Sequence, residues 1–119
     1  MTDEDIKKFT DKDITVLNAI EFTTKEGAHI IGVHQDIKTF EKERYFYTTR
    51  NLIEILKNNN AWISIPHPTH ATGVLSVGLI EDDLNFCLLN AHFIEKASSK
   101  YGEFNIKNIL AKYTNLKPI

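Results

Sequence analysis

Short apolar runs alternate with polar segments along the chain, and each run has the length of one strand or one helix. The stretch ITVLNAIEF (14–22) is rich in β-branched and apolar residues, which predicts a strand. A predicted turn, TTKEG (23–27), separates it from a second predicted strand, AHIIGVH (28–34). Gly27 can adopt the positive φ that a hairpin loop of this length often needs. The pattern therefore predicts a β-hairpin near the start of the domain.

Helical and extended patterns alternate after the hairpin. Residues 35–47 are polar with interspersed aromatic residues, which we interpret as a loop or a short helix. The clearest helix is predicted at 48–60, where Thr48 or Thr49 can cap the first turn and an apolar stripe follows one side. The asparagine run at its end favours termination, because asparagine tolerates a left-handed cap. The segment AWISI (61–65) then predicts a strand.

The second half of the chain carries weaker patterns. We predict a loop over 66–73, and a short extended piece that leads into a helix over 75–85. A strand is predicted at 91–97, a loop at 98–103 and a helix at 104–113. Alternation of this kind is typical of an α/β domain with some parallel strand pairing. We therefore expect a mixed sheet with two or three flanking helices.

Length and composition favour a single soluble domain spanning residues 1–119, with residues 1–12 as a polar lead-in that includes a short helix near residues 4–9. That lead-in has no apolar core of the kind a signal peptide needs, and no apolar run is long enough to cross a bilayer. One cysteine, Cys87, cannot form an internal disulfide, which favours a reducing compartment and predicts a cytoplasmic protein. The net charge of −2 disfavours binding to nucleic acid or an anionic membrane.

The predicted hairpin brings a carboxylate close to an imidazole. If residues 23–27 form the loop, Glu21 lies opposite His29 on the same face of the sheet, with Cβ atoms about 4.5–5.5 Å apart. His34 is an odd number of positions from His29, so in a regular strand it points to the other face. A simple cross-strand pair explains Glu21 and His29 by themselves, and a shared ligand is the functional alternative.

A third candidate side chain ends the predicted strand 61–65. His67 lies between Pro66 and Pro68, which narrow the backbone choices around it and help to orient its ring. The carboxyl end of a parallel strand is the edge at which α/β sheets place their ligands. His67 is therefore a stronger candidate for a functional residue than an isolated histidine would be.

Taken in order, these segments resemble a known family. The stretches LNAIEFTTKEGAHIIGV and NLIEILKNNNAWISIPHP are similar to the central portion of the polymerase and histidinol phosphatase (PHP) domain family, and HFIEKASSKYGEFNI resembles a later strand and loop. The resemblance covers about residues 14–110. It implies part of a distorted seven-stranded β/α barrel and a metal-dependent phosphoesterase, in which a metal-activated water attacks a phosphate ester.

The resemblance also implies a ligand set. Glu21, His29 and His67 occupy the positions that bind one metal of a two- or three-metal cluster, so a divalent cation (zinc, manganese or iron) is the implied cofactor. The implied partner is a phosphorylated small molecule or a nucleotide. Where many family members place an arginine after the histidine–proline pair, this chain has His70, which becomes a candidate phosphate contact.

The departures from the family are large. The chain lacks the opening D-x-H-x-H motif, the T-D-H-like segment and the closing S-D-x-H motif, and Pro66 replaces an alanine. The chain is therefore a fragment of a longer enzyme, a relative without catalysis, or one of two chains that rebuild a site. The unpaired strand edges of a partial barrel favour a homo-oligomer or a larger chain. A non-catalytic interaction or ligand-binding module is the alternative function.

The remaining candidates have simpler explanations. Asp82 and Asp83 suit the start of a helix, and His92 suits a satisfied buried or edge histidine better than a ligand. Glu95 is undecided between these two roles. Turn chemistry accounts for the polar loop at 98–101. Cys87 lacks the surroundings of a nucleophile and is predicted to be a small buried residue.

Overall fold

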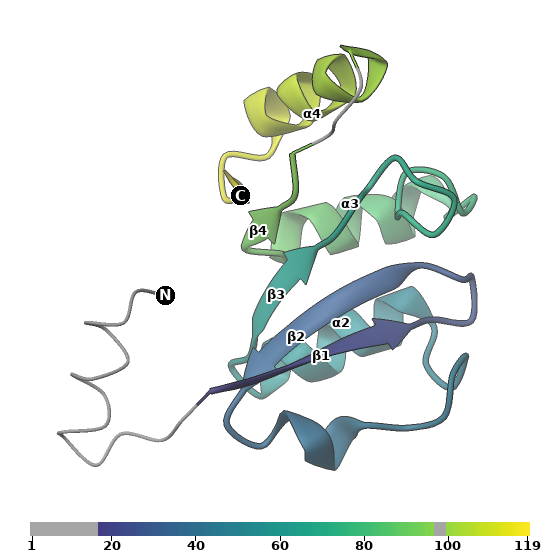
Figure 1. Cartoon of the computed structure of the whole chain (residues 1–119), viewed down its shortest axis with the longest axis vertical. Coiled ribbons are helices and arrows are strands. Elements are labelled where there is room, and N and C mark those ends of the chain that lie inside the picture. The colour runs from purple at the N-terminus through teal and green to yellow at the C-terminus, as the bar shows by residue number, and fades with distance from the viewer. Residues whose placement is uncertain (1–16, 97–99) are drawn as a thin grey trace, which may run out of the picture.

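One mixed sheet of five strands organises the described part of the chain, residues 17–96 and 100–119 of this computed structural model. The sheet order follows the sequence: β1 (Asn18–Thr23), β2 (His29–His34), β3 (Trp62–Ile65), β4 (Phe93–Ile94) and β5 (Lys117–Pro118). A 3₁₀ turn, η1 (Ile37–Phe40), and the helices α2 (Thr49–Asn58), α3 (Glu81–Asn90) and α4 (Lys100–Lys112) connect the strands. The expected α/β domain with a mixed sheet and flanking helices is confirmed (Figure 1).

The type of strand pairing changes once across the sheet, from antiparallel to parallel. β1 pairs with β2 and β2 with β3 in antiparallel fashion, whereas β3 pairs with β4 and β4 with β5 in parallel. Parallel neighbours need a crossover connection, and α3 and α4 supply the two crossovers. β1 and β3 therefore point toward the same side of the molecule, as their arrowheads show in Figure 1.

The hairpin register differs from the predicted one. Thr23 pairs with His29 and Glu21 with Ile31, so the expectation that Glu21 lies opposite His29 is wrong. The loop comprises residues 24–28, because the Thr24 and Ala28 backbones bond to each other and the Ala28 N–H also donates to the Thr24 hydroxyl at 3.1 Å. The loop begins and ends one residue later than predicted, so the pairing between the two strands shifts by two residues. Because side chains alternate with a period of two, Glu21 and His29 remain on one face of the sheet.

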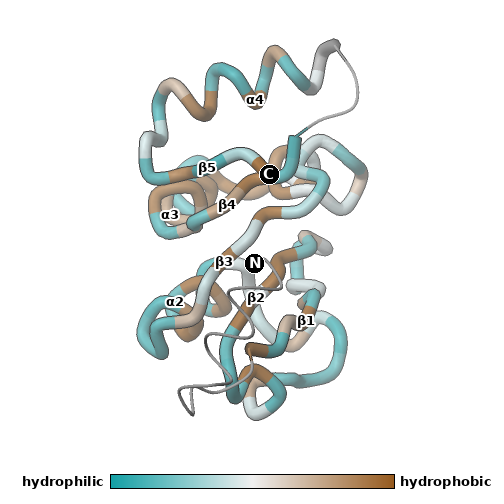
Figure 2. Tube along the Cα trace, turned by 60° about the vertical axis from the view of Figure 1, so that its left-hand side comes forward, coloured by the Kyte–Doolittle hydropathy of each residue, from teal (hydrophilic) through white to brown (hydrophobic). Residues whose placement is uncertain are grey.

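Helix α2 covers one face of the hairpin because its apolar stripe packs there. Its residues Leu52, Ile53 and Leu56 are fully buried, and the Thr48 hydroxyl caps the first turn by accepting from the Asn51 N–H at 3.1 Å. The helix ends before Asn60, which has a positive φ of 58°. α2 and α3 lie on the same face of the sheet, and hydrophobic positions colour their inner sides (Figure 2).

A polar joint ties the hairpin loop to the start of α2. Glu26 Oε1 accepts from the Thr49 N–H at 2.8 Å and from the Thr49 hydroxyl at 2.7 Å, and the Thr49 and Thr24 hydroxyls are 2.9 Å apart. Burial by itself raises the pKa of the Glu26 carboxyl, but the hydrogen bonds from Thr49 and Thr24 outweigh it and lower the pKa below its usual 4.5. A carboxylate at a helix N-terminus also interacts favourably with the helix dipole.

The second half of the chain departs more from its predictions. Residues 75–78 form turns where an extended piece was predicted, and the strand predicted at 91–97 contains two residues, Phe93 and Ile94. The loop predicted at 98–103 is wrong from Lys100 onward, because α4 begins there. β5 was not predicted, since two residues that include a proline carry no strand pattern and become a strand through pairing with β4. The polar lead-in at 1–12, the first residues of the predicted strand 14–22, and residues 97–99 lie outside the described residues.

The chain end after α4 returns to α3. The Asn115 side-chain amide donates to the Leu88 and Ala91 carbonyl oxygens, each at 2.9 Å, and thereby satisfies two carbonyls at the C-terminus of α3. The Tyr113 hydroxyl donates to Asn85 Oδ1 in the middle of the same helix. No helix among the described residues has both the length and the apolar character that a membrane span requires.

Candidate metal centre

One edge of the sheet gathers the three candidate side chains. The end of β1, the start of β2 and the end of β3 meet at this edge because β1 and β3 run in the same direction and β2 runs against them. Glu21 lies near the end of β1, His29 begins β2, and His67 follows two residues after the end of β3. Residues that are 38 positions apart in the sequence are thus brought into contact by the sheet.

The three side chains meet at hydrogen-bonding distances. His29 Nδ1 is 3.3 Å from Glu21 Oε1 and 3.3 Å from His67 Nε2. Glu21 Oε2 is 3.9 Å from His67 Nε2. One ligand atom from each residue lies within 4.8 Å of the other two. The sequence therefore identified residues that do converge, although the predicted hairpin register was wrong.

Proton counting makes a purely hydrogen-bonded trio unsatisfactory. A neutral imidazole has one N–H and one acceptor nitrogen, and a carboxylate has acceptors only. His29 Nδ1 faces both a carboxylate oxygen and the other ring's Nε2, so its single hydrogen can serve one of them at most. If Nδ1 accepts from His67 instead, its lone pair faces the carboxylate. A cation placed among the three atoms satisfies all three lone pairs at once.

The spacing of the ligand atoms also suits a small divalent cation. Zinc–nitrogen and zinc–oxygen bonds of about 2.0–2.2 Å in tetrahedral geometry place ligand atoms about 3.3–3.6 Å apart. The separations of 3.3, 3.3 and 3.9 Å between the three residues are close to this value. Two imidazoles and one carboxylate are a known ligand set for catalytic metals and leave at least one position for another molecule. The residues present therefore fit the cation that the family resemblance implies.

The cluster is accessible from solvent but not fully exposed. The His29 and His67 side chains are 23% and 22% exposed, and the Glu21 side chain is 46% exposed. The two rings are 5.1 Å apart and inclined at 70° to each other. Their burial holds the nitrogens in place, while the carboxylate side remains open to a second molecule.

The backbone at His67 explains the flanking prolines. His67 has a φ of 25°, in the left-handed region that residues other than glycine rarely adopt. Its N–H donates to Glu95 Oε1 at 3.1 Å, and Glu95 follows directly after β4. Pro66 and Pro68 are both buried and restrict the chain on each side. These contacts hold His67 in a costly conformation that directs its ring to Glu21 and His29.

Thr72, which the sequence did not single out, contacts both histidines. Its carbonyl oxygen accepts from the His29 N–H at 2.8 Å, and its hydroxyl is 3.5 Å from His67 Nδ1. The loop returns to this place through a tight fold at Gly73, where a Cβ atom would lie 2.2 Å from the Pro68 carbonyl oxygen. Partners of this kind fix the tautomer and orientation of metal-binding histidines.

The other candidates lie outside the cluster. The exposed His70 ring stacks on His67, with centroids 5.2 Å apart and planes inclined by 16°. His34 accepts from the Asp36 N–H at 3.0 Å and contacts Phe40. As predicted, Asp82 and Asp83 lie in the first turn of α3, where Asp83 pairs with Arg50 at 3.1 Å.

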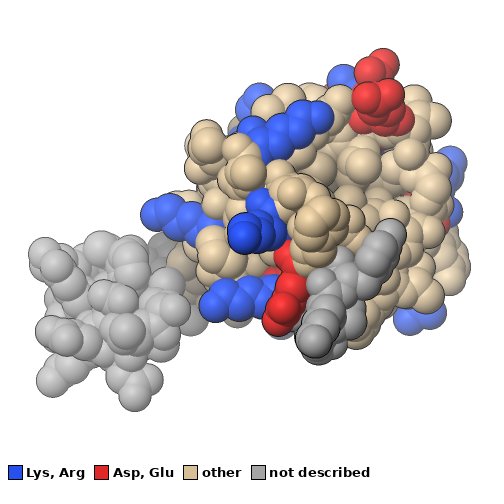
Figure 3. All heavy atoms as spheres, turned by 90° about the horizontal axis from the view of Figure 1, so that it is seen from above, with Lys and Arg blue, Asp and Glu red and all other residues tan. Residues whose placement is uncertain are grey.

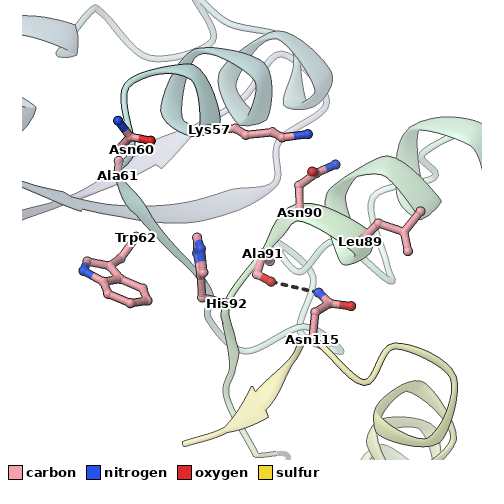
Figure 4. Close-up of a pocket in the computed structure, with 9 residues that line it drawn as sticks. All are labelled: Lys57, Asn60, Ala61, Trp62, Leu89, Asn90, Ala91, His92 and Asn115. Carbon is pink, nitrogen blue, oxygen red and sulfur yellow. Dashed lines mark hydrogen bonds between the residues drawn. The ribbon is translucent and has the colours of Figure 1, made fainter.

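His92 lies at the opposite edge of the sheet. Its Nδ1 accepts from the Ile63 N–H at 3.0 Å, as expected for a hydrogen-bonded histidine, and burial lowers its pKa. A cavity of about 490 Å³ opens beside it between the C-termini of α2 and α3 (Figure 4). The cavity and the Glu21–His29–His67 cluster are thus separate features at the two ends of β3.

A smaller cleft adjoins the cluster. It has a volume of about 230 Å³, and Glu21 and His29 belong to its lining. The segment 41–44, Glu-Lys-Glu-Arg, and Tyr47 form the facing wall. The cluster therefore adjoins a cleft that a small molecule can enter.

Comparisons with known proteins add no relative from which a function follows. No family model matches this chain, and no curated protein sequence matches it. The function of this chain is therefore inferred from its residues and their geometry.

Proposed function

We propose that Glu21, His29 and His67 bind one divalent cation, and that this site belongs to a PHP-like metal-dependent phosphoesterase domain equivalent to part of a β/α barrel. The observation that carries the proposal is the convergence of two imidazole nitrogens and one carboxylate oxygen, all within 4.8 Å of one another. The ordered family resemblance had named the same three residues. A sheet whose last three strands are parallel and joined by helices is compatible with the proposed barrel origin.

Each residue has a distinct part in this proposal. Glu21 supplies the negative charge that compensates the cation and, being the most exposed of the three, faces the entering substrate. His29 and His67 supply neutral nitrogens held by burial and by Thr72. When bound, a cation of this kind activates water and polarises a phosphate ester. His70, stacked on His67 at the exposed side, is positioned to contact a phosphate oxygen.

Metal analysis of the purified protein tests the proposal. After incubation with Mn²⁺ or Zn²⁺ and removal of free ions, we expect a stoichiometric metal content, which Glu21→Gln and His67→Ala should abolish or strongly reduce. His34→Ala is the matched control, because His34 lies on β2 but its ring contacts Phe40 instead of the cluster. A wild-type protein without metal, or variants that retain as much metal as the control, would contradict the proposal.

A non-catalytic ligand-binding module is the second candidate, and one observation favours it. The described residues bring together one such group of three ligands, whereas the family resemblance implies two or three metals. Hydrolysis of p-nitrophenyl phosphate by the metal-loaded protein separates the two functions. Activity that Glu21→Gln removes supports the esterase, and metal binding without activity supports the module.

A further inference from the structure

The cleft beside the cluster has a preformed wall. Tyr45 N–H donates to the Thr23 carbonyl at 3.0 Å, and the Lys25 N–H donates to the Tyr47 carbonyl at 2.7 Å, which holds segment 41–47 against the end of β1. The Tyr47 hydroxyl donates to the Phe40 carbonyl at 2.6 Å and fixes the far side. Tyr45 has a φ of 69°, an uncommon conformation for a bulky residue. The wall is therefore specified by several contacts at once.

Two cations on this wall have no acidic partner among the described residues. Lys42 and Arg44 line the cleft, yet neither forms an ion pair within 4.0 Å with any acidic side chain of residues 17–96 and 100–119. The contrast is Arg50, which pairs with both Glu54 and Asp83. The Lys42 ammonium lies 5.8 Å from the Phe46 ring, a weak contact. Both cationic groups are thus available to an anion in the cleft.

The charge of the cleft depends on the proposed cation. Glu41 and Glu43 also line it and offset the two basic residues, so Glu21 leaves the metal-free cleft with a net negative charge. A bound divalent cation more than compensates Glu21 and makes the cleft net positive. An anion should therefore bind together with the metal, and by linkage each should tighten the binding of the other.

We propose that this cleft binds the phosphate group of a small phosphorylated molecule, with Lys42 and Arg44 contacting the phosphate oxygens on the side away from Glu21 and His29. This inference rests on the proposed function and names the specificity residues of the same site. The volume of about 230 Å³ is below the range of about 300–1,000 Å³ typical of drug-sized ligands, so the cleft holds a phosphate group and little more.

Isothermal titration calorimetry of the Mn²⁺-loaded protein with inorganic phosphate tests the inference. We expect the double variant Lys42→Gln/Arg44→Gln to bind phosphate about tenfold or more weakly than the wild type, because charge-assisted hydrogen bonds are lost. The variant should still bind Mn²⁺ as the wild type does when phosphate is absent. The matched control is Lys38→Gln, an exposed lysine that does not line the cleft.

The outcomes separate this inference from the proposed function. Equal phosphate affinity in the double variant and the wild type overturns the inference, even if both bind Mn²⁺. Absence of phosphate binding by the wild type, with or without Mn²⁺, also overturns it. Phosphate binding that depends on Lys42 and Arg44 in a protein that takes up no metal would instead support the cleft and overturn the metal site.

Discussion

At the scale of single residues, the cluster depends on strain that its neighbours maintain. His67, with its φ of 25°, occupies a backbone region that costs of order 1–3 kcal/mol for a residue other than glycine. The Glu95 carboxylate accepts its N–H, and Thr72 contacts its Nδ1. Strained residues of this kind persist where surrounding contacts determine their conformation, and they concentrate at functional sites.

Replacing the Thr72 hydroxyl tests its role in orienting His67. Thr72→Val keeps the shape of the side chain and the carbonyl that accepts from the His29 N–H, but it removes the contact with His67 Nδ1. We expect metal affinity to fall about 10–100-fold, because such partners orient metal-binding histidines. Competition with a chromophoric chelator measures the affinity.

Thr72→Ser is the matched control, since it retains the hydroxyl and should retain most of the affinity. Nitrogen chemical shifts of the imidazoles in the metal-free protein give a second readout, in which Thr72→Val should alter the tautomer balance of His67. Unchanged affinity and unchanged shifts in Thr72→Val would show that the hydroxyl has no orienting role.

At the scale of elements, a polar joint between the hairpin loop and α2 holds one side of the site. Glu26 and Thr24 in the loop bond to Thr49 at the start of the helix, and Thr24 and Thr49 are fully buried. At the other end of the hairpin, Gly32 permits close packing, because a Cβ atom there would lie 2.9 Å from Ile37 and 3.0 Å from Leu56. The position of His29 on β2 therefore depends on contacts with α2 at both ends of the strand.

The lowered pKa of Glu26 predicts a pH-dependent contribution to stability. A carboxyl whose folded-state pKa lies below its unfolded value of 4.5 stabilises the fold fully above that value, and the stabilisation disappears as the pH falls through the lower, folded-state pKa. Glu26→Gln should reduce the free energy of unfolding by about 1 kcal/mol at pH 7. Buried charge-assisted hydrogen bonds contribute more than this, and the partial exposure of Glu26 lowers their contribution.

Urea denaturation at several pH values measures this difference. The gap between wild type and Glu26→Gln should be constant above about pH 5.5 and shrink below pH 4.5. Glu54→Gln is the control, because its exposed pairing with Arg50 is worth a few tenths of a kcal/mol. A gap that is independent of pH would assign the effect of Glu26→Gln to shape and not to charge.

At the scale of the whole molecule, the two ends of the sheet differ in chemistry. The Glu21–His29–His67 cluster and its charged cleft lie at one edge, and the 490 Å³ cavity beside His92 lies at the other. Seen from the α4 end, basic side chains are interspersed with acidic and uncharged ones (Figure 3). Together with the net charge of −2, this distribution fits a small anionic ligand at one site better than a long polyanion along a surface.

Cys87 on α3 reports on the integrity of the whole fold. Its side chain is fully buried, and burial raises its pKa to about 12. We expect no reaction with iodoacetamide in the native protein at pH 8, and labelling along a urea titration should follow the loss of helical circular dichroism. Rapid labelling in native buffer would show that α3 separates from the core without global unfolding.

The sequence by itself determined the local parts of the site. Runs of β-branched and apolar residues located β1, β2 and β3. The Thr48 cap and the Asn60 stop located α2, and the predicted hairpin placed Glu21 and His29 on one face. These features follow from short-range sequence patterns. Moving the hairpin loop by one residue along both strands leaves the same side chains on the same face of the sheet. The position of His67 just after a strand was likewise readable from its neighbours.

Tertiary structure alone decided the rest. β5 is a strand because β4 lies beside it, and Thr72 meets His29 and His67 because the loop folds back at Gly73. The available charges of Lys42 and Arg44 depend on where segment 41–47 is held against β1. Each of these features is set by contacts between residues that are distant in sequence or joined by irregular backbone, and such contacts leave no periodic pattern in the chain.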